Sequence, residues 1–310
     1  MSAGEQVWTR YWTRGRSRSG AGCLPNAAGP VEAAQKRAWQ DFARTLQRRA
    51  RVLDLATGNG IVLGWMLEVR RDLKGVGVDS AAELPPPPKG AVLKAGVTLE
   101  RLPFPDSGFD AATSQFGFEY AEAEAASKEL VRVLRADAPL LMIVHHSDSP
   151  IVEHNRSRAE ALRWASSPER WLARAEAFAS AGTGLPVPQL FREAPAEARR
   201  AFPAQPAAAE FALGLLQRLE AGRRGRPAEA QALVRDIAAE ARDELARIGL
   251  LEAAALDSAG SARLAATLAE AGFAMEPLEL LPDPSSGGPL AWLLAGRRGA
   301  ADASGRETSR

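Results

Sequence analysis

The chain is short of the residues from which several kinds of site are built. It has a single cysteine, Cys23, which excludes an internal disulfide and argues against a cysteine-based metal site. We therefore expect no bound metal. The net charge is only +1, so no overall field attracts nucleic acid or an anionic membrane. The longest apolar runs, such as residues 140–144, are far too short to cross a bilayer.

The remaining composition is that of an ordinary globular protein. The chain is 46% hydrophobic and 25% charged, and its 310 residues suffice for one large domain or for a domain with an insertion. Residues 1–18 carry arginines but no apolar core, so they do not have the pattern of a secretory signal. We expect a cytoplasmic protein without membrane segments. Its oligomeric state cannot be derived from these features.

The most informative segment is Val52–Gly60, which reads Val-Leu-Asp-Leu-Ala-Thr-Gly-Asn-Gly. Its first half predicts a buried strand, and its second half predicts a glycine-rich turn. Because glycine has no Cβ, the backbone of such a turn can approach a ligand closely. The segment therefore predicts a nucleotide-binding turn at the end of a strand.

Strand and helix patterns alternate along the first half of the chain and return at its end. After a helix over 31–49, we predict strands at 51–55, 75–79, 91–96, 109–116 and 139–146, with helices at 61–71 and 127–135 between them. Two more strands are predicted at 273–281 and 289–295. This alternation is typical of an α/β fold with a doubly wound, mostly parallel, Rossmann-like sheet, here of seven strands.

Between residues 148 and 256 the pattern is helical and almost without strand signals. Ser167 and Pro168 predict one helix start, and the clearest helix runs over 227–248 with Gly249 as its stop. We predict five regions: an N-terminal arm (1–30), a cofactor-binding core (31–150), a helical cap inserted after strand five (151–257), the end of the core (258–298) and a disordered tail (299–310).

Two kinds of nucleotide-binding protein carry a glycine turn of this type. The dinucleotide fingerprint needs a third glycine three residues after Gly60, but Leu63 stands there, although Gly64 follows. Asp79 fits the acid that either kind requires. Asp54, which lies inside the strand end, would oppose a pyrophosphate and suits a cationic ligand that carries an amino group. The dinucleotide interpretation is therefore the weaker one.

Two further stretches favour the second kind of nucleotide-binding protein over the dinucleotide-binding kind. Leu102–Asp110 reads Leu-Pro-Phe-Pro-Asp-Ser-Gly-Phe-Asp, and Glu129–Arg135 reads Glu-Leu-Val-Arg-Val-Leu-Arg. Together with Val52–Gly60 they resemble motifs of the class I S-adenosylmethionine-dependent methyltransferases, in the branch that contains the ubiquinone/menaquinone C-methyltransferases. The resemblance covers residues 52–146, about a third of the chain, and returns weakly at 262–297. It implies S-adenosylmethionine as the cofactor and a methyl transfer as the reaction.

The resemblance also implies which residues hold the cofactor. Asp54 would orient the turn or reach the amino group of S-adenosylmethionine, and Asp79 would accept hydrogen bonds from both ribose hydroxyls. The family often places an acid near the adenine, where this chain has Thr98, with Glu100 two residues later. The full implied set is Asp54, Ala56, Gly58, Asn59, Gly60, Asp79, Ser80, Leu99, Glu100 and Gln115.

The methyl acceptor is expected near the ends of the fourth and fifth predicted strands, because ligands of open α/β sheets bind beyond the carboxyl ends of the strands. These ends are Ser114–Tyr120 and His145–Asp148. Histidine suits a proton acceptor in a methyl transfer to O or N, and the candidate catalytic residues are His145, His146 and Glu119. Alternation along a strand allows at most one of the two rings to face the acceptor. The rings can also serve to hold the strand end through backbone hydrogen bonds.

Three functions are compatible with these features. The first is methyl transfer to O, N or C of a small molecule under a helical lid. The second is an RNA or protein methyltransferase, motivated by the N-terminal arginines among Trp8, Tyr11 and Trp12; the balanced charge of the remaining chain argues against a nucleic-acid partner. The third is a non-catalytic binding protein, against which the retained Asp54, Gly58, Gly60 and Asp79 argue.

Overall fold

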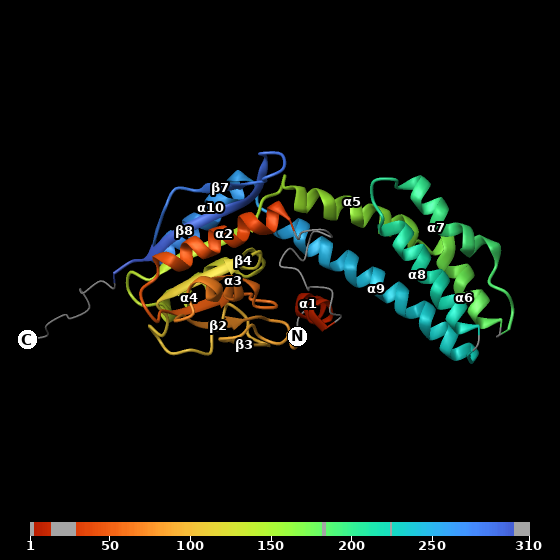
Figure 1. Ribbon diagram of the computed structural model, residues 1–310, viewed down its shortest axis with the longest axis horizontal. Helices are drawn as coiled ribbons and strands as arrows, with labels where there is room; N and C mark the ends of the chain where they lie inside the picture. Colours follow the sequence, from red (N-terminus) through yellow and green to blue (C-terminus); the bar gives the residue numbers. More distant parts are fainter. Residues whose placement is uncertain (1–2, 14–28, 182–183, 224, 301–310) are drawn as a thin grey trace, which may run out of the picture. The chain divides into compact units, whose positions relative to one another are not determined.

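A computed structural model describes residues 3–13, 29–181, 184–223 and 225–300 (Figure 1). The described chain divides into two compact units. Residues up to Val152 and from Ala253 onward form one, here called the sheet unit, and Glu153–Glu252 form the other, here called the helical unit. Most of the predicted tail, from residue 301, and residues 14–28 of the predicted arm lie outside the described residues.

The described part of the sheet unit contains a mixed sheet. Its strands are β1 (Arg51–Leu55), β2 (Lys74–Val78), β3 (Ala91–Lys94), β4 (Ala111–Gln115), β5 (Pro139–His145), β6 (Phe273–Met275), β7 (Glu279–Pro282) and β8 (Pro289–Arg298). They lie in the order β3-β2-β1-β4-β5-β8-β6, and β7 also pairs with β8. The first five strands are mutually parallel, and β8 runs antiparallel to β5. The predicted doubly wound, mostly parallel sheet is confirmed.

The sheet has eight strands where seven were predicted, because the predicted strand at 273–281 is interrupted. Its two parts, β6 and β7, both pair antiparallel with β8. Between them the N–H of Glu276 still donates to the carbonyl of Ala295, but Pro277 follows and has no N–H to continue the ladder. A proline in the middle of this stretch therefore divides one expected strand in two.

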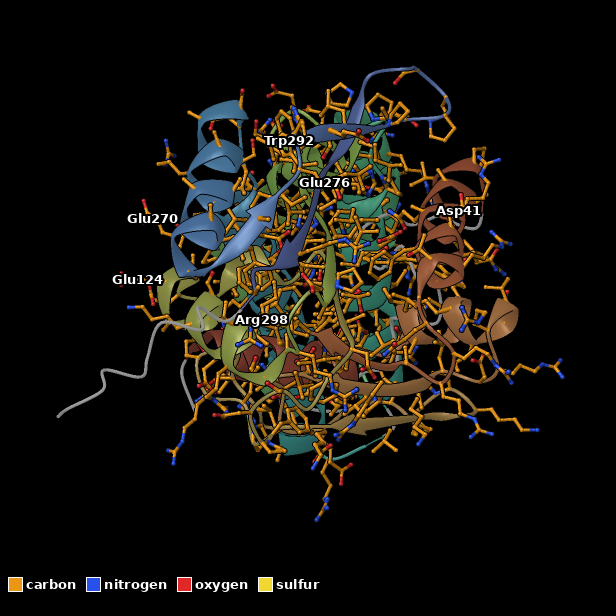
Figure 2. All side chains as sticks on the ribbon, turned by 90° about the vertical axis from the view of Figure 1, so that its left-hand side faces the viewer. Asp41, Glu124, Glu270, Glu276, Trp292 and Arg298 are labelled. Carbon is orange, nitrogen blue, oxygen red and sulfur yellow. The ribbon has the colours of Figure 1, made fainter. Side chains whose placement is uncertain are left out.

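Helices cover both faces of this sheet (Figure 2). α2 (Pro30–Thr45) and α3 (Ile61–Val69) pack against each other on one face, and α4 (Ala123–Val133) and α10 (Ser258–Ala271) pack together on the other. In Figure 2, Asp41 of α2 and Glu270 of α10 mark the two sides, with Trp292 of β8 between them. Because both faces are covered, β1 and β4 are buried along almost their whole length.

The core of the sheet unit joins the strands to α4 and α10. Leu53 of β1, Leu130 of α4 and Leu268 of α10 are all completely buried in one apolar cluster. α10 ends at Gly272, which has a left-handed φ of 117° and donates back to the last turn of the helix. The core thus holds the central strands rigidly, and their carboxyl ends are positioned by it.

The helical unit is formed by α5 (Pro150–Ala165), a π-helical turn (Pro168–Leu172), α6 (Ala173–Ser180), α7 (Gln189–Ala201), α8 (Ala207–Gly222) and α9 (Pro227–Ala254). It has its own apolar core, which includes Trp171, Phe191 and Phe211. The Arg170 guanidinium lies 3.5 Å from the centre of the Trp164 ring and pairs with Glu197. The unit therefore has the internal packing of an independent helical layer.

The predicted stop of α9 at Gly249 was wrong. The helix continues through Gly249 to Ala254, and this glycine does not take a left-handed conformation. Glycine inside a helix costs only about 1 kcal/mol. The next turn buries Leu251 completely, and burial of a leucine side chain is worth about 1.5–3 kcal/mol. Tertiary packing therefore outweighs the local preference.

The packing in the sheet unit predicts a contrast between two leucines. Leu130→Ala removes a fully buried side chain and should lower the free energy of unfolding by about 2–5 kcal/mol. The matched change Leu280→Ala, on β7, removes a side chain that is 47% exposed and should cost less than about 1 kcal/mol. Urea denaturation of both variants checks this, and equal losses would contradict the described core.

Candidate active site

The predicted site residues follow strands that meet where the strand order reverses. From β1 the chain continues to β2 and β3 on one side of the sheet, and β4 and β5 lie on the other side. In doubly wound sheets a crevice forms at such a point, outside the carboxyl ends of the strands. The turn after β1, Asp79 after β2, and the segments after β4 and β5 all lie at this edge.

The glycine turn after β1 is left-handed at three positions. Gly58 and Gly60 have φ values of 52° and 73°, and Gly60 immediately precedes α3. Ala56 also has a positive φ, 50°, although it carries a Cβ. After β4, Phe116 has a φ of 54°. Strain of this kind, of order 1–3 kcal/mol for a non-glycine residue, is concentrated at functional sites.

Asp54 holds the turn from inside β1. It is 1% exposed, its Oδ2 accepts a hydrogen bond of 2.6 Å from the Thr57 hydroxyl, and its Oδ1 accepts one of 2.8 Å from the Thr113 hydroxyl. Burial raises the pKa of this carboxyl to about 7, and the negative charge of nearby Asp79 adds a smaller increase. The two threonine hydroxyls oppose that rise. Asp54 therefore orients the turn through Thr57, and its pKa lies in the neutral range.

Asp79 joins the end of β2 to the same turn. Its Oδ2 accepts from the N–H of Gly58 and its Oδ1 from the N–H of Ala81, both at 2.9 Å. Burial raises the pKa of Asp79 as well, while these two backbone hydrogen bonds oppose the rise. A carboxylate has about four acceptor positions, so each oxygen retains a position for one further donor. Two adjacent hydroxyls, such as those of a ribose, match that requirement.

Three other predicted cofactor residues make hydrogen bonds within the protein. The Asn59 side chain accepts from the N–H of Ile61 at 3.2 Å, at the start of α3. Gln115 Oε1 accepts from the Trp39 ring N–H at 2.6 Å. Glu100 Oε1 accepts from the N–H of Glu122, the residue before α4, at 2.9 Å. Glu100 thus anchors the start of α4, and Leu99 beside it is buried in the core cluster while Ser80 is half-buried.

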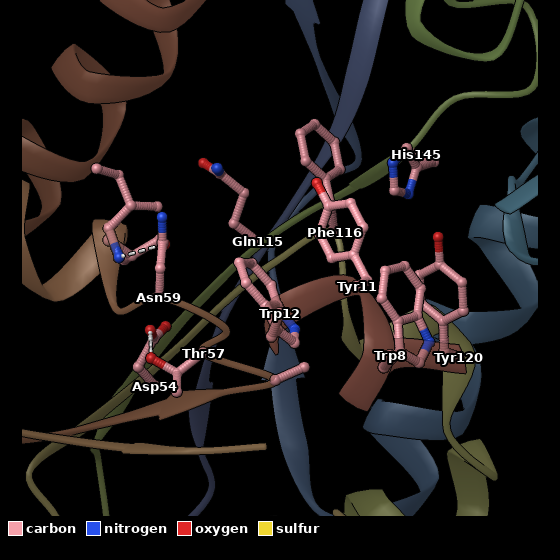
Figure 3. Close-up of a pocket in the computed structure, with 13 residues that line it drawn as sticks. Trp8, Tyr11, Trp12, Asp54, Thr57, Asn59, Gln115, Phe116, Tyr120 and His145 are labelled. Carbon is pink, nitrogen blue, oxygen red and sulfur yellow. Dashed lines mark hydrogen bonds between the residues drawn. The ribbon is translucent and has the colours of Figure 1, made fainter. Parts of the chain in front are cut away.

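A cavity opens at this edge of the sheet unit (Figure 3). Five of the predicted site residues line it: Asp54, Ala56, Asn59, Gln115 and His145. The other lining residues are Thr57, Ile61, Val62, Phe116, Tyr120 and the three aromatic residues Trp8, Tyr11 and Trp12. Asp54 and Thr57 of the β1 turn and an aromatic wall therefore face one space, while Asp79, Gly58 and Gly60 are not among the residues that line it.

Two of the three catalytic candidates are paired at the cavity. Glu119 lies in the short 3-10 helix η1 (Phe118–Tyr120) after β4, and its Oε1 accepts from both the backbone N–H of His145 at 3.0 Å and the ring Nδ1 at 2.8 Å. Both side chains are buried. Phe116 stacks on the imidazole, with ring centres 4.2 Å apart. Because the carboxylate faces Nδ1, the neutral ring carries its proton there and its lone pair on Nε2.

His146 lies apart from this pair, as alternation along the strand requires. Its ring stacks on Trp292 with centres 4.8 Å apart, and its Nδ1 accepts from the N–H of Asp148 at 3.0 Å. It does not line the cavity described above. The structure therefore brings His145 and Glu119 together and gives His146 contacts that hold the end of β5.

Several residues that shape the site were not predicted from the sequence. Thr57 and Thr113, which bond Asp54, were not singled out, and the hydroxyl of Thr57 beside the glycines was the available signal. The first residues of the chain were treated as an arm, but residues 3–13 form a helix, α1 (Ala3–Thr13). Its side chains Trp8, Tyr11 and Trp12 line the cavity (Figure 3).

Among the residues that the structure describes, no group of three histidine, cysteine, aspartate or glutamate side chains is placed to hold a metal ion. Within the same residues, no helix has the length and apolar character needed to cross a membrane.

The raised pKa of Asp54 predicts a pH-dependent cost to stability. The folded protein keeps a proton that the unfolded chain releases near its ordinary pKa of about 3.9, so the free energy of unfolding should fall as pH rises from about 4 through about 7. Asp54→Asn removes this titration. Relative to that variant, the wild-type protein should lose on the order of 4 kcal/mol over this window, as measured by denaturation at a series of pH values.

A second aspartate provides the control for this measurement. Hydrogen bonding, chiefly from the Ser286 hydroxyl, lowers the pKa of Asp283. Asp283→Asn should therefore follow the wild-type pH dependence between about pH 5 and pH 8. If Asp54→Asn also runs parallel to the wild type across that range, the assignment of a raised pKa to Asp54 is wrong.

Comparison with known proteins gives consistent matches over the strands that carry this site. The sequence model of a family described as "Methyltransferase domain" matches residues 53–142. The uncharacterized methyltransferase YcgJ of Bacillus subtilis (strain 168) is 29% identical over 133 residues, which are 39% of this chain and 51% of that protein. Demethylmenaquinone methyltransferase of Thermus thermophilus is 36% identical over 106 residues, which are 30% of this chain and 46% of that protein. The chain therefore spans about half the length of the curated relatives it matches.

A solved structure is similar over a longer stretch and at low identity. The 1,6-didemethyltoxoflavin-N1-methyltransferase of Burkholderia thailandensis aligns with 96% of this chain and 87% of its own, at 13% identity and a TM-score of 0.45. The sequence matches fall on the segment that runs from β1 into β5, and this segment carries the glycine turn and Asp79. Over residues 53–142, the sheet unit therefore resembles a methyltransferase domain.

Proposed function

We propose that this protein transfers a methyl group from S-adenosylmethionine to a small molecule. The observation that carries the proposal is the bond from the Gly58 N–H to Asp79 Oδ2, which ties the glycine turn after β1 to the acid after β2. The two carboxylates at this edge, Asp54 and Asp79, suit a ligand that has a cationic amino group at one end and a ribose diol at the other. The match of residues 53–142 to the methyltransferase-domain family supports the same cofactor.

The residues present fit this cofactor at its polar ends. Asp79 would accept from the ribose hydroxyls, and Ser80 follows it on the nucleoside side. Asp54, with the turn that it orients through Thr57, would face the amino group. A cation beside Asp54 favours its charged form, which burial alone disfavours. Leu99 and Glu100 would lie on the adenine side, although the Glu100 carboxylate is engaged by Glu122.

We assign the proton transfer to His145. Bound S-adenosylmethionine supplies an electrophilic methyl group on a sulfonium sulfur. His145 lines the cavity, and its Nε2 lone pair, fixed by the Nδ1 contact to Glu119, would accept the proton of an O–H or N–H acceptor. Glu119 is then a positioning residue, because it fixes the tautomer and stabilises the imidazolium that forms. Phe116, stacked on the ring, keeps water from one of its faces.

A small acceptor is favoured by the lining of the cavity. Ligand sites for small molecules are concave and mostly apolar, with a few polar groups that fix orientation. Here Phe116, Tyr120 and the aromatic side chains of α1 supply the apolar wall, and His145 with Gln115 supplies the polar groups. The overall charge of +1 gives no field that would draw in a nucleic acid.

Binding of S-adenosylhomocysteine tests the cofactor assignment. Wild-type protein should bind it and be stabilised in a thermal shift assay, while NAD should give no shift. Asp79→Asn removes one acceptor for the ribose and should weaken binding at least tenfold by isothermal titration calorimetry. The exposed neighbour Glu83 provides the control, since Glu83→Gln should leave the affinity unchanged. Stabilisation by NAD alone would contradict the proposed function.

The His145–Glu119 pair predicts a separation of binding from catalysis. With an acceptor identified by transfer of labelled methyl groups, His145→Gln should lower kcat by at least about 100-fold and leave the affinity for S-adenosylhomocysteine within twofold. The role of Glu119 has its own readout. The chain has three histidines, so ¹⁵N shifts can report the Nδ1–H tautomer of His145, which Glu119→Ala should abolish because it removes the acceptor of the Nδ1–H. An unchanged tautomer in that variant would remove the positioning role.

A further inference from the structure

The N-terminal helix α1 lies across the carboxyl edge of the sheet unit. The Thr9 hydroxyl accepts a hydrogen bond of 2.9 Å from the N–H of Ala82, in the loop after Asp79. The preceding residue, Trp8, meets the ring of Tyr120, after β4, edge to face with ring centres 5.4 Å apart. α1 thus spans the ends of strands that contribute the cofactor residues.

Trp12 fills the space that the missing side chain of Gly58 leaves open. A Cβ built on Gly58 would lie 2.1 Å from Trp12 Cζ2, 2.4 Å from Cη2 and 2.9 Å from Cε2. Such distances are impossible for real atoms, so the indole rests directly on the Gly58 backbone. The bare backbone of a glycine turn is the surface on which a ligand can approach closely, and here an aromatic ring of the same chain covers it.

The cavity beside these rings is correspondingly small. Its volume is about 90 Å³ with Trp8, Tyr11 and Trp12 in place. Sites that bind ligands of the size of a nucleoside cofactor have volumes of about 300–1,000 Å³. A cofactor in contact with Gly58 needs the space that the Trp12 indole occupies, so the two cannot lie there together.

We propose that α1 competes with the cofactor for the carboxyl edge, with Trp12 as the competing group, and that cofactor binding displaces α1. This inference rests on the proposed function, because it takes S-adenosylmethionine as the ligand of the Gly58 turn. An isolated helix of 11 residues is marginal in water, so displaced α1 loses the support that keeps it helical. The apparent affinity for the cofactor is reduced by the fraction of molecules in which α1 is displaced.

The same movement uncovers the acceptor side. Tyr11 stands edge to face against both Trp8 and Trp12, with ring centres 5.7 Å and 5.0 Å away, so the three rings form one packed group. Trp8 and Tyr11 line the cavity that His145 also lines. Displacement of the group by the cofactor therefore opens the space in front of His145, and the cofactor binds before the acceptor.

A change of affinity in full-length protein tests the competition. Trp12→Ala should bind S-adenosylhomocysteine about tenfold more tightly than wild type by isothermal titration calorimetry, which corresponds to displacement of α1 in about one wild-type molecule in ten. Gln6→Ala, an exposed position of the same helix, provides the matched control and should bind like wild type. Equal or weaker binding by Trp12→Ala overturns the proposal, and weaker binding identifies Trp12 as a cofactor contact.

Hydrogen exchange of the wild-type protein provides a second measurement that needs no variant. Saturating S-adenosylhomocysteine should speed amide exchange in residues 3–13, while exchange in α4 should not change. Slower or unchanged exchange in α1 overturns the proposal. Failure of the proposed function would be distinguishable, since neither wild type nor Trp12→Ala would then bind S-adenosylhomocysteine at all.

Discussion

The hydrogen bond from the Gly58 N–H to the Asp79 carboxylate is the interaction on which the rest of the site depends. It joins the turn after β1 to the end of β2, and it uses one lone pair of an acid that is 6% exposed. The other oxygen of this acid accepts from the N–H of Ala81, so the carboxylate bonds the turn after β1 and the loop after β2 at once. Without this bond, the N–H of Gly58 would lose its hydrogen-bond partner at the edge of the sheet. The turn after β1 would then no longer be tied to Asp79 at the end of β2.

Much of the sheet unit could be predicted from the sequence because its signals are local and repeated. Near-continuous apolar strands, a glycine turn and an aspartate at the next strand end each depend on a few neighbouring residues, and β1, β2, β4 and β5 lie within a few residues of their expected bounds. Predictions failed where a distant contact overrules a local preference. Gly249 should end a helix, but the burial of Leu251 carries the helix past it. Within the site, alternation separates His145 from His146, but only the fold brings Glu119 to one of them.

Helix α1 shows the same limit more strongly. Nothing in the spacing of Trp8, Tyr11 and Trp12 identifies the surface that they cover, because the partners are Tyr120 and Gly58, far away along the chain. Aromatic residues near a chain start commonly pack on a core, and these pack on the edge where the strands end. A glycine without a Cβ accommodates a cofactor and an indole equally well. Gly58 therefore correctly indicates that another group approaches the backbone of the turn closely. It does not indicate whether that group is a cofactor or the Trp12 indole.

The site is held in an unfavourable arrangement that a bound ligand would relieve. Asp54 is buried with its pKa raised to about 7, and Ala56 and Phe116 keep strained, left-handed backbones at neighbouring strand ends. These costs are sustained by the apolar core beneath, in which Leu53, Leu55 and Met142 are completely or almost completely buried. A cationic amino group beside Asp54 would lower the electrostatic cost, whereas the neutral Trp12 indole covers the turn without compensating that charge. Displacement of the ring by a cofactor thus exchanges an apolar contact for a charge-compensating one, and the buried acid is what makes that exchange favourable.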